Sequence, residues 1–465
     1  MEQQGIRENK MGVMPIGKLV VSMSLPIIIS MLVQALYNIV DSVFVSMISQ
    51  EALNAVSLAY PAQNLMIGFA TGSAVGVNAL VSRALGARDG DRANRVAANG
   101  LFVVACCYVL FLLFAIFGAR PFFALQTTNE TVIQYGVDYL IVVCGLSFGM
   151  FGQIMMERLL TSTGRTIYTM ISQLSGAIFN IIFDPIFMFV FHMGVTGAAL
   201  ATVLGQMVGC VIAVVFNRRK NPDLQLSMRK FRPDGNIVRD ICAIGVPSIT
   251  MVAVGSVMTF LFNIILFNYT AGTTYTQNVF GIYFKLNSLI FMPVFGLNNG
   301  VVPIIAYNFG ACNRERMLSA IRLGILIAAA LMAVGTLVFM LFPEALLSIF
   351  ITNASAEEIE ILYSIGRPAL RIISTHFISA AVSISFNSVY QALGKGCYAM
   401  ITSVCRQLVV LLPVAWVLAI IGHNVGNDNL VWISFPVAEL ASLALSLLLY
   451  RRVKRNIISK VEAVA

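Results

Sequence analysis

The sequence predicts an all-α integral membrane protein with twelve transmembrane helices, arranged as two six-helix bundles related by a pseudo-two-fold axis along the membrane normal. Three observations predict this fold class: an apolar composition, about twelve apolar runs joined by alternately basic and Lys/Arg-poor loops, and an internal repeat. Of the 465 residues, 58% are hydrophobic and only 11% are charged, and the mean hydropathy is +0.85. A chain of this composition is expected to have the bilayer as its solvent.

Apolar runs long enough to cross a bilayer occur about twelve times. A spanning helix needs about 20 predominantly apolar residues, and such runs are centred near residues 32, 68, 105, 145, 178, 205, 252, 292, 330, 375, 410 and 440. The connections between them are too short for a soluble domain. The segment before the first run lacks the apolar core and small-residue cleavage site of a signal peptide, so we expect the first span to be retained.

Lys and Arg residues fall on alternate loops. The segment 218–239 and the tail after Tyr450 are strongly basic, whereas connections such as FNYTAGTTYTQN and IGHNVGNDN contain no Lys or Arg. By the positive-inside rule we expect the basic loops and both termini to be cytoplasmic, which requires an even number of spans. The net charge of +9 is thereby explained by basic residues on the cytoplasmic loops. A nucleic-acid partner is therefore not expected.

An internal repeat divides the chain in two. A shift of about 224 residues lays IGFATGSAVGVNALVSRALGARDGDR (67–92) over FMPVFGLNNGVVPIIAYNFGACNRER (291–316). The superposed pairs are Gly72 with Gly296, Gly76 with Gly300, Gly86 with Gly310, Ala87 with Ala311, and Arg92 with Arg316. Six spans per half give both halves the same orientation, as in parallel repeats. We predict an N-terminal six-helix lobe over residues 1–220 and a C-terminal six-helix lobe over 221–465, with 221–239 as the cytoplasmic linker.

A polar stripe interrupts the first apolar run. It consists of four residues spaced i, i+3, i+4 and i+7: Gln34, Tyr37, Asn38 and Asp41. This spacing places them on one face of a helix whose other positions are almost all apolar. A charge at membrane depth costs about 2.5 to 3.5 kcal/mol even on the lenient insertion scales, so Asp41 indicates a functional site. For Gln34 and Asn38, hydrogen bonding between helices is the alternative.

A second acid occurs in the fifth span, in the stretch NIIFDPIF. Asn180 and Asp184 are four residues apart and share a helix face. Pro185 follows and removes the usual donor for the carbonyl of Ile181. Carboxylate, amide and carbonyl oxygens suit a hard cation. A kinked helix in which Asp184 only bonds to a neighbour is the alternative.

The rise of an α-helix places both acids at one depth. At about 1.5 Å per residue, Asp41 lies roughly 30 Å beyond the inner end of its helix, and Asp184 roughly 28 Å beyond Arg165. Both acids are therefore expected in the outer half of the first lobe. The inward-running fourth and sixth spans bring Tyr139 and Thr202 to a similar depth.

Four stretches resemble the multidrug and toxic compound extrusion (MATE) family: PIIISMLVQALYNIVDSVFVS, RALGARDGDRANR, SGAIFNIIFDPIF and FMPVFGLNNGVVPIIAYNFGA. The resemblance runs over essentially the whole chain. It implies two six-helix bundles in a V shape and a place in the bacterial cell (inner) membrane. It also implies alternating-access export of varied, often cationic, amphipathic drugs against an inward flow of protons or sodium ions.

The same resemblance implies a cation site in the first lobe. The positions that match the family's site are Asp41, Asn180, Asp184 and Thr202, with Tyr139 nearby. A proton or a sodium ion would bind there, and the sequence leaves that choice open. No cofactor besides the coupling ion is expected.

The second lobe lacks acids at the matching positions. The repeat offset places Asp41 on Ile265, and alignment of the glycine turns that follow the fourth and tenth spans places Asp184 on Val414. Some MATE branches couple through acids of the second lobe. Because this sequence departs from that pattern, the first lobe is predicted to hold the site.

We expect six residues to line a substrate cleft: Gln34, Tyr37, Asn38, Met150, Lys285 and Arg406. Methionine gives such a cleft an adaptable apolar wall. Lys285 and Arg406 either line the cleft or bind backbone carbonyls and hold the bundle together, and Arg371 fits equally well near the outer interface. The sequence leaves the roles of these three cations open.

Other classes of function fit less well. A flippase for a lipid-linked precursor, of the same superfamily, is the main alternative, and a larger and more basic cleft would be expected of it. An enzyme is not expected, because His192, His376 and His423 are scattered and no CxxC, HExxH or nucleophile motif occurs. The eight cysteines are predicted to be core residues rather than disulfides or metal ligands.

A channel or receptor is disfavoured by the internal repeat with its acid pair. Small-molecule drugs and the lipid bilayer are the expected partners, and no obligate protein partner is indicated. The sequence leaves the identity of the substrate and the oligomeric state open.

Overall fold

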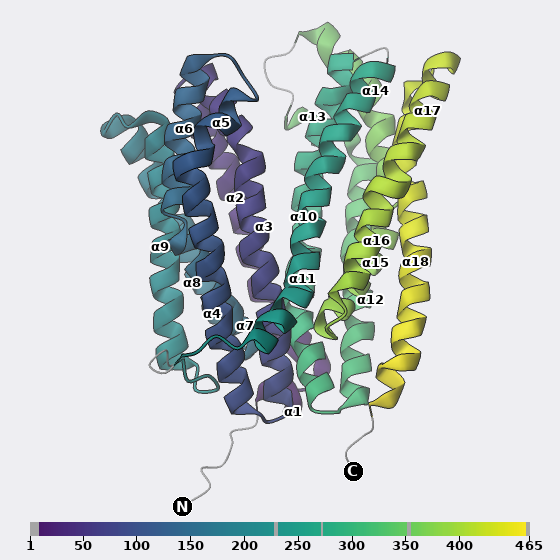
Figure 1. The fold of residues 1–465 in the computed structure, drawn as a ribbon. Helices are drawn as coiled ribbons and strands as arrows, with labels where there is room; N and C mark the ends of the chain where they lie inside the picture. The colour runs from purple at the N-terminus through teal and green to yellow at the C-terminus, as the bar shows by residue number, and fades with distance from the viewer. Residues whose placement is uncertain (1–8, 227–230, 271–272, 351–354, 462–465) are drawn as a thin grey trace, which may run out of the picture.

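The computed structural model of the chain describes residues 9–226, 231–270, 273–350 and 355–461. Within these ranges the protein is built from helices and has no β-strand. Ten segments are long and apolar enough to cross a membrane, and two helix pairs bent by 43° and 48° complete the set of twelve. The prediction of an all-α, twelve-helix fold is confirmed. Both described chain ends lie at one end of the bundle, which we call the termini end; the opposite end is the far end (Figure 1).

The N-terminal half contains six spans, preceded by the short helix α1 (Lys10–Val13). Its elements are α2 (Ile16–Ser46), α3 (Gln50–Gly86), α4 (Gly90–Leu113) with η1 (Phe114–Gly118) and α5 (Ala119–Ala124), α6 (Glu130–Gly145) with α7 (Phe148–Ser162), α8 (Thr166–Pro185) with η2 (Ile186–Val190), and α9 (Gly194–Lys220). The π-helical segment η2 begins directly after Pro185, where the missing backbone donor interrupts the regular α-helical ladder.

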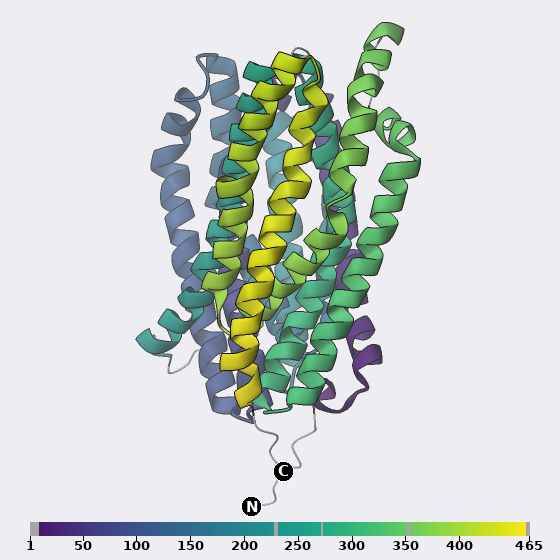
Figure 2. The same cartoon turned by 90° about the vertical axis from the view of Figure 1, so that its right-hand side faces the viewer.

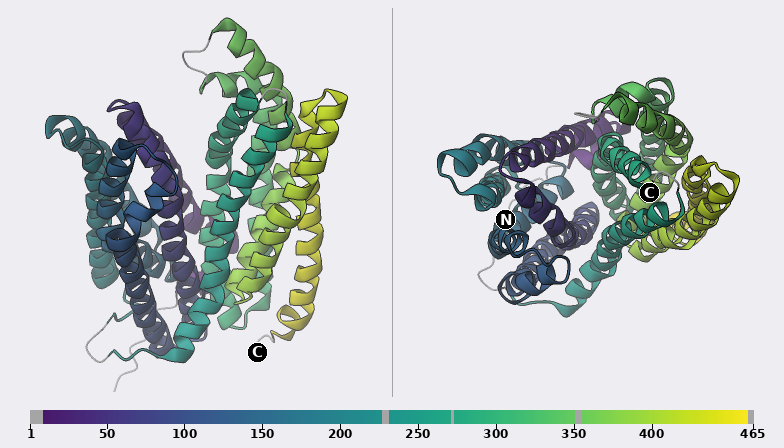
Figure 3. Two further views of the ribbon diagram at one scale, coloured as in Figure 1. Left: turned by 45° about the horizontal axis from the view of Figure 1, so that its top comes forward. Right: turned by 90° about the horizontal axis from the view of Figure 1, so that it is seen from above.

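The C-terminal half repeats this order. Its elements are α10 (Gly235–Tyr269), α11 (Thr273–Gly310), α12 (Arg314–Leu341) with α13 (Pro343–Ser348), α14 (Ala356–Ser374) with α15 (Phe377–Ala392), α16 (Gly396–Val404) with η3 (Cys405–Leu411) and α17 (Leu412–Val425), and η4 (Asp428–Ile433) with α18 (Ser434–Asn456) and η5 (Ile458–Lys460). Seen from the far end, the two halves lie side by side (Figure 3). Helix α10 begins at Gly235, inside the predicted linker of 221–239.

The internal repeat extends to the turns that follow the second and eighth spans. Asp89 caps α4 by accepting the amide N–H of Arg92 at 2.9 Å, and Asn313, 224 residues later, caps α12 by accepting that of Arg316 at 3.1 Å. The residue before each cap has a left-handed backbone, with φ of 58° at Arg88 and 55° at Cys312. The helix caps and the left-handed residues match, so these two turns have the same local backbone structure.

Two hydrophobic cores form, and the first helix of each half contributes to the core of the other half. Leu19, Val20 and Met23 of α2 pack in the core of the C-terminal half. Ile237 and Ile241 of α10 pack in the core of the N-terminal half. The two halves are therefore interlocked at the termini end, while helices such as α18 lie on the outside of the C-terminal half (Figure 2). The domain division at residues 220 and 221 stays a prediction.

Glycines allow the halves to approach closely. A Cβ atom added at Gly76 of α3 would lie 2.6 Å from the carbonyl oxygen of Ile241 in α10, and one at Gly300 of α11 would lie 2.8 Å from Cα of Ser24 in α2. Such distances are far below van der Waals contact, so a larger residue would push the helices apart. The repeat-related glycines thus form two equivalent contacts, α3 with α10 and α2 with α11.

A short N-terminal strap, residues 9–14, joins the two halves at the termini end. The amide of Asn9 donates to the carbonyl oxygen of Thr163 in the N-terminal half at 3.1 Å. In the C-terminal half, the Arg316 guanidinium donates to the carbonyl oxygens of Met11 at 3.2 Å and Met14 at 2.7 Å. The strap therefore ties the two halves together through backbone and side-chain hydrogen bonds. All eight cysteines are free thiols.

Candidate cation site in the N-terminal half

Helices α8 and α9 position the amide of Asn180 beside an acid. Its nitrogen Nδ2 donates to Oδ1 of Asp184 at 3.3 Å and to Oγ1 of Thr202 at 3.2 Å. Asp184 is fully buried, and Asn180 is 3% exposed. Because both amide hydrogens point to these two oxygens, the amide orientation is fixed and its oxygen Oδ1 faces away from them.

Asp41 of α2 completes the acid pair. Its carboxyl group lies within hydrogen-bonding reach of the Asp184 carboxyl. Two carboxylates this close cannot both carry an unscreened negative charge, so they must share a proton or a bound cation. Among the described residues, the ion pairs involve neither acid. No Lys or Arg in the described ranges therefore neutralises the pair through an ion pair.

Within the described part of the chain, three buried oxygens at this site have no hydrogen-bond partner: Oδ1 of Asp41, Oδ1 of Asn180 and Oδ2 of Asp184. Buried acceptors are almost always satisfied in native proteins, so each one that is not requires an explanation. Oxygen acceptors from two carboxylates and one amide match the preference of hard cations, and the carboxylates equally suit a proton. The donor set therefore fits the coupling ion expected from the sequence.

Tyr139 and Gln63 flank the acid pair. The Tyr139 ring on α6 is 3% exposed, and its hydroxyl accepts a hydrogen bond from Nε2 of Gln63 in α3 at 3.1 Å. Tyr139 lies close enough to both Asp41 and Asp184 to interact with their charges. The structure thus brings together all five residues predicted for the site. Gln63 was not predicted, because its helix carries polar residues at several other positions as well.

The predicted cleft residues of the N-terminal half have different environments. Gln34 is exposed on α2, and its side chain hydrogen-bonds with Tyr37, which also interacts with the charge of Asp41. The Asn38 side chain lies outside the described residues. Met150 is 3% exposed and packs in the core of the N-terminal half.

The predicted cations of the C-terminal half have partners of different kinds. The ammonium of Lys285 lies 5.6 Å from the ring centroid of Phe350, in cation–π geometry. The guanidinium of Arg406 lies 3.1 Å from a carboxylate oxygen of Glu439. Arg371 is exposed and donates from Nε to the carbonyl oxygen of Met340 at 3.3 Å.

Two buried acids were not predicted from the sequence. Glu157 of α7 is 3% exposed and accepts hydrogen bonds from Gln153, Ser172 and Gln173 at 2.8 to 2.9 Å. Because its oxygens are well satisfied, it acts as a structural hub. Glu439 of α18 is 2% exposed. For Glu439 the available signal was a single acid inside a largely apolar run, whereas Glu157 is followed directly by Arg158.

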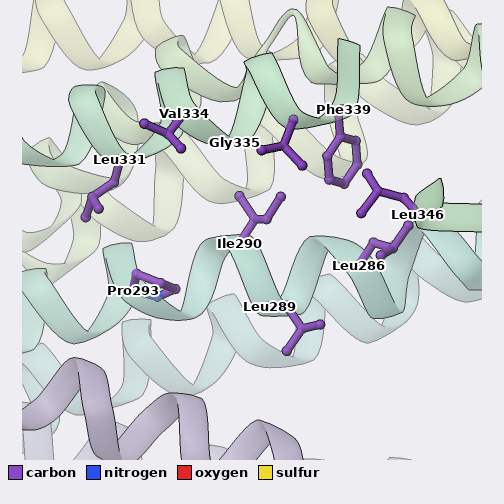
Figure 4. A pocket seen from close by; sticks show the side chains of 10 residues that line it. Leu286, Leu289, Ile290, Pro293, Leu331, Val334, Gly335, Phe339 and Leu346 are labelled. Atoms are coloured by element: carbon purple, nitrogen blue, oxygen red, sulfur yellow. The ribbon is translucent and has the colours of Figure 1, made fainter. Parts of the chain in front are cut away.

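A cavity of about 290 Å³ lies between α11 and α12 in the C-terminal half (Figure 4). Its lining is apolar throughout: Leu286, Leu289, Ile290, Pro293, Leu331, Val334, Gly335, Val338, Phe339 and Leu346. These side chains offer no ligand to an ion.

The fold defines a multi-pass membrane protein built from two related six-helix halves. A MatE family profile matches residues 26–186 and 247–417, most of both halves. The chain belongs to the MATE family of multidrug export transporters, as its sequence motifs predict.

Curated relatives match almost the full length of the chain. The multidrug export protein MepA of Staphylococcus haemolyticus is 29% identical over 430 residues, which cover 91% of each chain. MepA of Staphylococcus aureus is 24% identical over 437 residues, which cover 94% of each chain. These relatives are multidrug export proteins from bacteria.

Solved structures share the fold. An outward-facing multidrug resistance MATE family transporter of the MOP superfamily superposes with a TM-score of 0.88, at 24% identity and 99% coverage of both chains. A MOP superfamily transporter from Pyrococcus furiosus, described as having a binding pocket of reversed polarity, gives a TM-score of 0.89 at 24% identity and 98% coverage of both chains.

Proposed function

We propose that this protein is a cation-coupled antiporter that exports varied, often cationic, amphipathic drugs by alternating access. The coupling ion, a proton or sodium, binds at Asp41 and Asp184. The observation that carries this proposal is that three buried oxygens, on Asp41, Asn180 and Asp184, lack a hydrogen-bond partner in the part of the chain that the structure describes. Because no fixed positive charge in that part of the chain neutralises this buried acid pair, binding of a mobile cation stabilises it.

The same proposal places the molecule in the bacterial cell membrane with both termini in the cytoplasm. Basic residues gather on the loops of the termini end, as the positive-inside rule requires of cytoplasmic loops. In this orientation the interlocked helices and the strap close the cytoplasmic side. Export then requires that they separate and rejoin in each cycle.

Coupling requires the ion to bind the two conformations with different affinity. Asp41 lies on α2, which packs against α11 of the other half through Ser24 and Gly300. Neutralising the acid pair would shift the position of α2 and, through this contact, the closure of the two halves. Inside the cell the ion leaves, and drug binding resets the cycle.

The test is efflux of a fluorescent cationic dye from proteoliposomes, driven in turn by a sodium gradient and by a pH gradient. Wild type, Asp41→Asn and Asp184→Asn are compared at equal amounts of inserted protein. One gradient should drive dye movement in wild type, and both variants should lose it. If neither gradient moves dye in wild type, the proposal fails, and transfer of a lipid-linked precursor becomes the next activity to assay.

A further inference from the structure

The C-terminal half contains a buried ion pair that the proposed transport cycle does not use. Oε2 of Glu439 in α18 lies 3.1 Å from Nη1 of Arg406, and the Glu439 side chain is 2% exposed. The second carboxylate oxygen, Oε1, is buried and has no hydrogen-bond partner among the described residues. Arg406 lies in η3, a π-helical segment between α16 and α17. Such segments re-aim side chains and are frequent at functional sites.

An aromatic cluster lies beside this pair, with Tyr283 close enough to interact with the charges of both Arg406 and Glu439. The ring of Phe435 lies one helical turn before Glu439 and packs against Phe262, Phe280 and Tyr283 at centroid distances of 5.2, 6.4 and 5.6 Å. A carboxylate in such apolar surroundings carries a large desolvation penalty unless it is paired. Glu439 therefore depends on whatever positive charge lies beside it.

Three titratable or charged groups face Glu439 in the described part of the chain. They are Tyr283 from α11, His376 from the break between α14 and α15, and Arg406 from η3. The Tyr283 hydroxyl donates to Oδ1 of Asn287 at 3.3 Å, and Nδ1 of His376 contacts the carbonyl oxygen of Ile373. Arg406 is the permanently charged member of this set, since a guanidinium does not deprotonate in proteins.

The Asp41–Asp184 pair and Glu439 thus differ in whether a fixed positive charge lies beside them. In the N-terminal half, Asp41 and Asp184 form no ion pair with Lys or Arg in the described part of the chain and leave oxygens unpartnered. In the C-terminal half, one acid is bound to one arginine. The Asp41–Asp184 pair needs a mobile cation to neutralise it, whereas Glu439 is already neutralised by Arg406.

We propose that Arg406 is the tethered cation of the C-terminal half, which keeps Glu439 neutralised throughout the cycle and so restricts ion coupling to the N-terminal half. This inference rests on the proposed function, because it assigns a positioning and specificity role within the same transport cycle. Replacement of the arginine by a neutral residue would leave Glu439 uncompensated. The second half would then need a proton or sodium ion of its own.

The test compares Arg406→Gln with Arg406→Lys, which keeps the charge, and with the double variant Arg406→Gln/Glu439→Gln, which removes both charges. Dye transport in proteoliposomes is measured against sodium concentration and against proton concentration in turn. For Arg406→Gln, the Hill slope for the driving ion should rise by about one, because a second ion site then takes part. Arg406→Lys and the double variant should retain the slope of wild type.

A slope for Arg406→Gln equal to that of Arg406→Lys, with both proteins active, would overturn the proposal. If Arg406→Gln does not fold, the double variant Arg406→Gln/Glu439→Gln tests whether Arg406 acts by neutralising Glu439. A folded double variant with wild-type ion dependence shows that the arginine is needed only to neutralise Glu439, whereas loss of folding there would assign the pair a purely architectural role.

An Asp41→Asn arm keeps this test separate from the proposed function. Unchanged ion-driven transport in Asp41→Asn contradicts the coupling site of the N-terminal half, whatever the Arg406 variants do. Loss of transport in Asp41→Asn, with no difference between the Arg406 variants, contradicts the tethered cation alone.

Discussion

Asn180 donates its amide to Asp184 one turn further along α8, at 3.3 Å, and to Thr202 of α9, at 3.2 Å. One side chain therefore orients the acid and joins two helices. Because both amide hydrogens are directed to these partners, its own oxygen remains as a buried acceptor. Under the proposed function, Asn180 is both a ligand for the coupling ion and the residue that orients the Asp184 carboxylate.

Asn180→Ala should weaken ion coupling without unfolding the protein. Loss of a residue that orients a ligand typically costs about 10- to 100-fold in ion affinity, so the driving-ion concentration that gives half-maximal dye transport should rise by that factor. Asn268→Ala, on the exposed face of α10, is the matched control and should behave as wild type. If Asn180→Ala and Asn268→Ala showed the same ion dependence, the assignment of Asn180 to the cation site would be wrong.

Tyr139→Phe tests the hydrogen bond with Gln63. The change removes the acceptor of the Gln63 amide while it keeps the ring in its buried position. A lost hydrogen bond of about 1 kcal/mol corresponds to about a fivefold change in the half-maximal ion concentration. The control is Tyr60→Phe on α3, because the Tyr60 side chain is 63% exposed and should tolerate the loss of its hydroxyl. A Tyr139→Phe protein with the ion dependence of Tyr60→Phe would contradict the assignment.

Gly300→Ala should destabilise the contact between α2 and α11. The new methyl group would meet Ser24 at 2.5 to 2.9 Å, and overpacking of this kind costs about 1 to 3 kcal/mol. Gly281→Ala on the same helix meets no atom within 4 Å and should be neutral or slightly stabilising. Thermal unfolding in detergent, followed for both variants, measures the difference. A lower midpoint for Gly281→Ala than for Gly300→Ala would contradict the packing argument.

Arg316→Ala should loosen the closure at the termini end. The change removes the hydrogen bonds from the guanidinium to the carbonyl oxygens of Met11 and Met14, which tie the strap to the C-terminal half. Charge-assisted hydrogen bonds contribute about 1.5 to 3 kcal/mol each, so the population with the termini end open should increase. Arg314→Ala, exposed on the same helix, is the control.

The readout for the strap is a distance distribution between spin labels at Asp91 and Lys395, two exposed positions at the termini end of opposite halves. Arg316→Ala should shift the distribution toward longer distances, and Arg314→Ala should leave it unchanged. Identical distributions in the two variants would show that the strap does not hold the halves together.

Much of the fold and of the candidate site follows from local rules of sequence. The number of spans follows from the length and apolarity of the sequence runs. Asn180 and Asp184 lie together because residues four positions apart share a helix face. Asp41 stands out because an acid in an apolar run is costly. Tyr139 and Thr202 required an additional step, in which helix direction and rise set a common depth.

Other features depend on contacts between helices, which no local pattern contains. Gln63 reaches Tyr139 only because α3 packs against α6 in this register. The start of α2 packs in the core of the C-terminal half, although it belongs to the N-terminal half by chain order. Glu439 finds its partner 33 positions away. Glu439 lies on α18, which carries neither of the positions that match Asp41 and Asp184 in the repeat.

Direct ion binding tests the central claim, that the Asp41–Asp184 pair holds the coupling ion. Purified protein in detergent would be equilibrated with radioactive sodium, and proton release would be followed in weakly buffered solution on addition of a cationic dye. Wild type should bind sodium, or release protons, in saturable amounts, and both Asp41→Asn and Asp184→Asn should lose that signal while retaining their thermal stability. Sodium binding and proton release in the two variants equal to those of wild type would contradict the account.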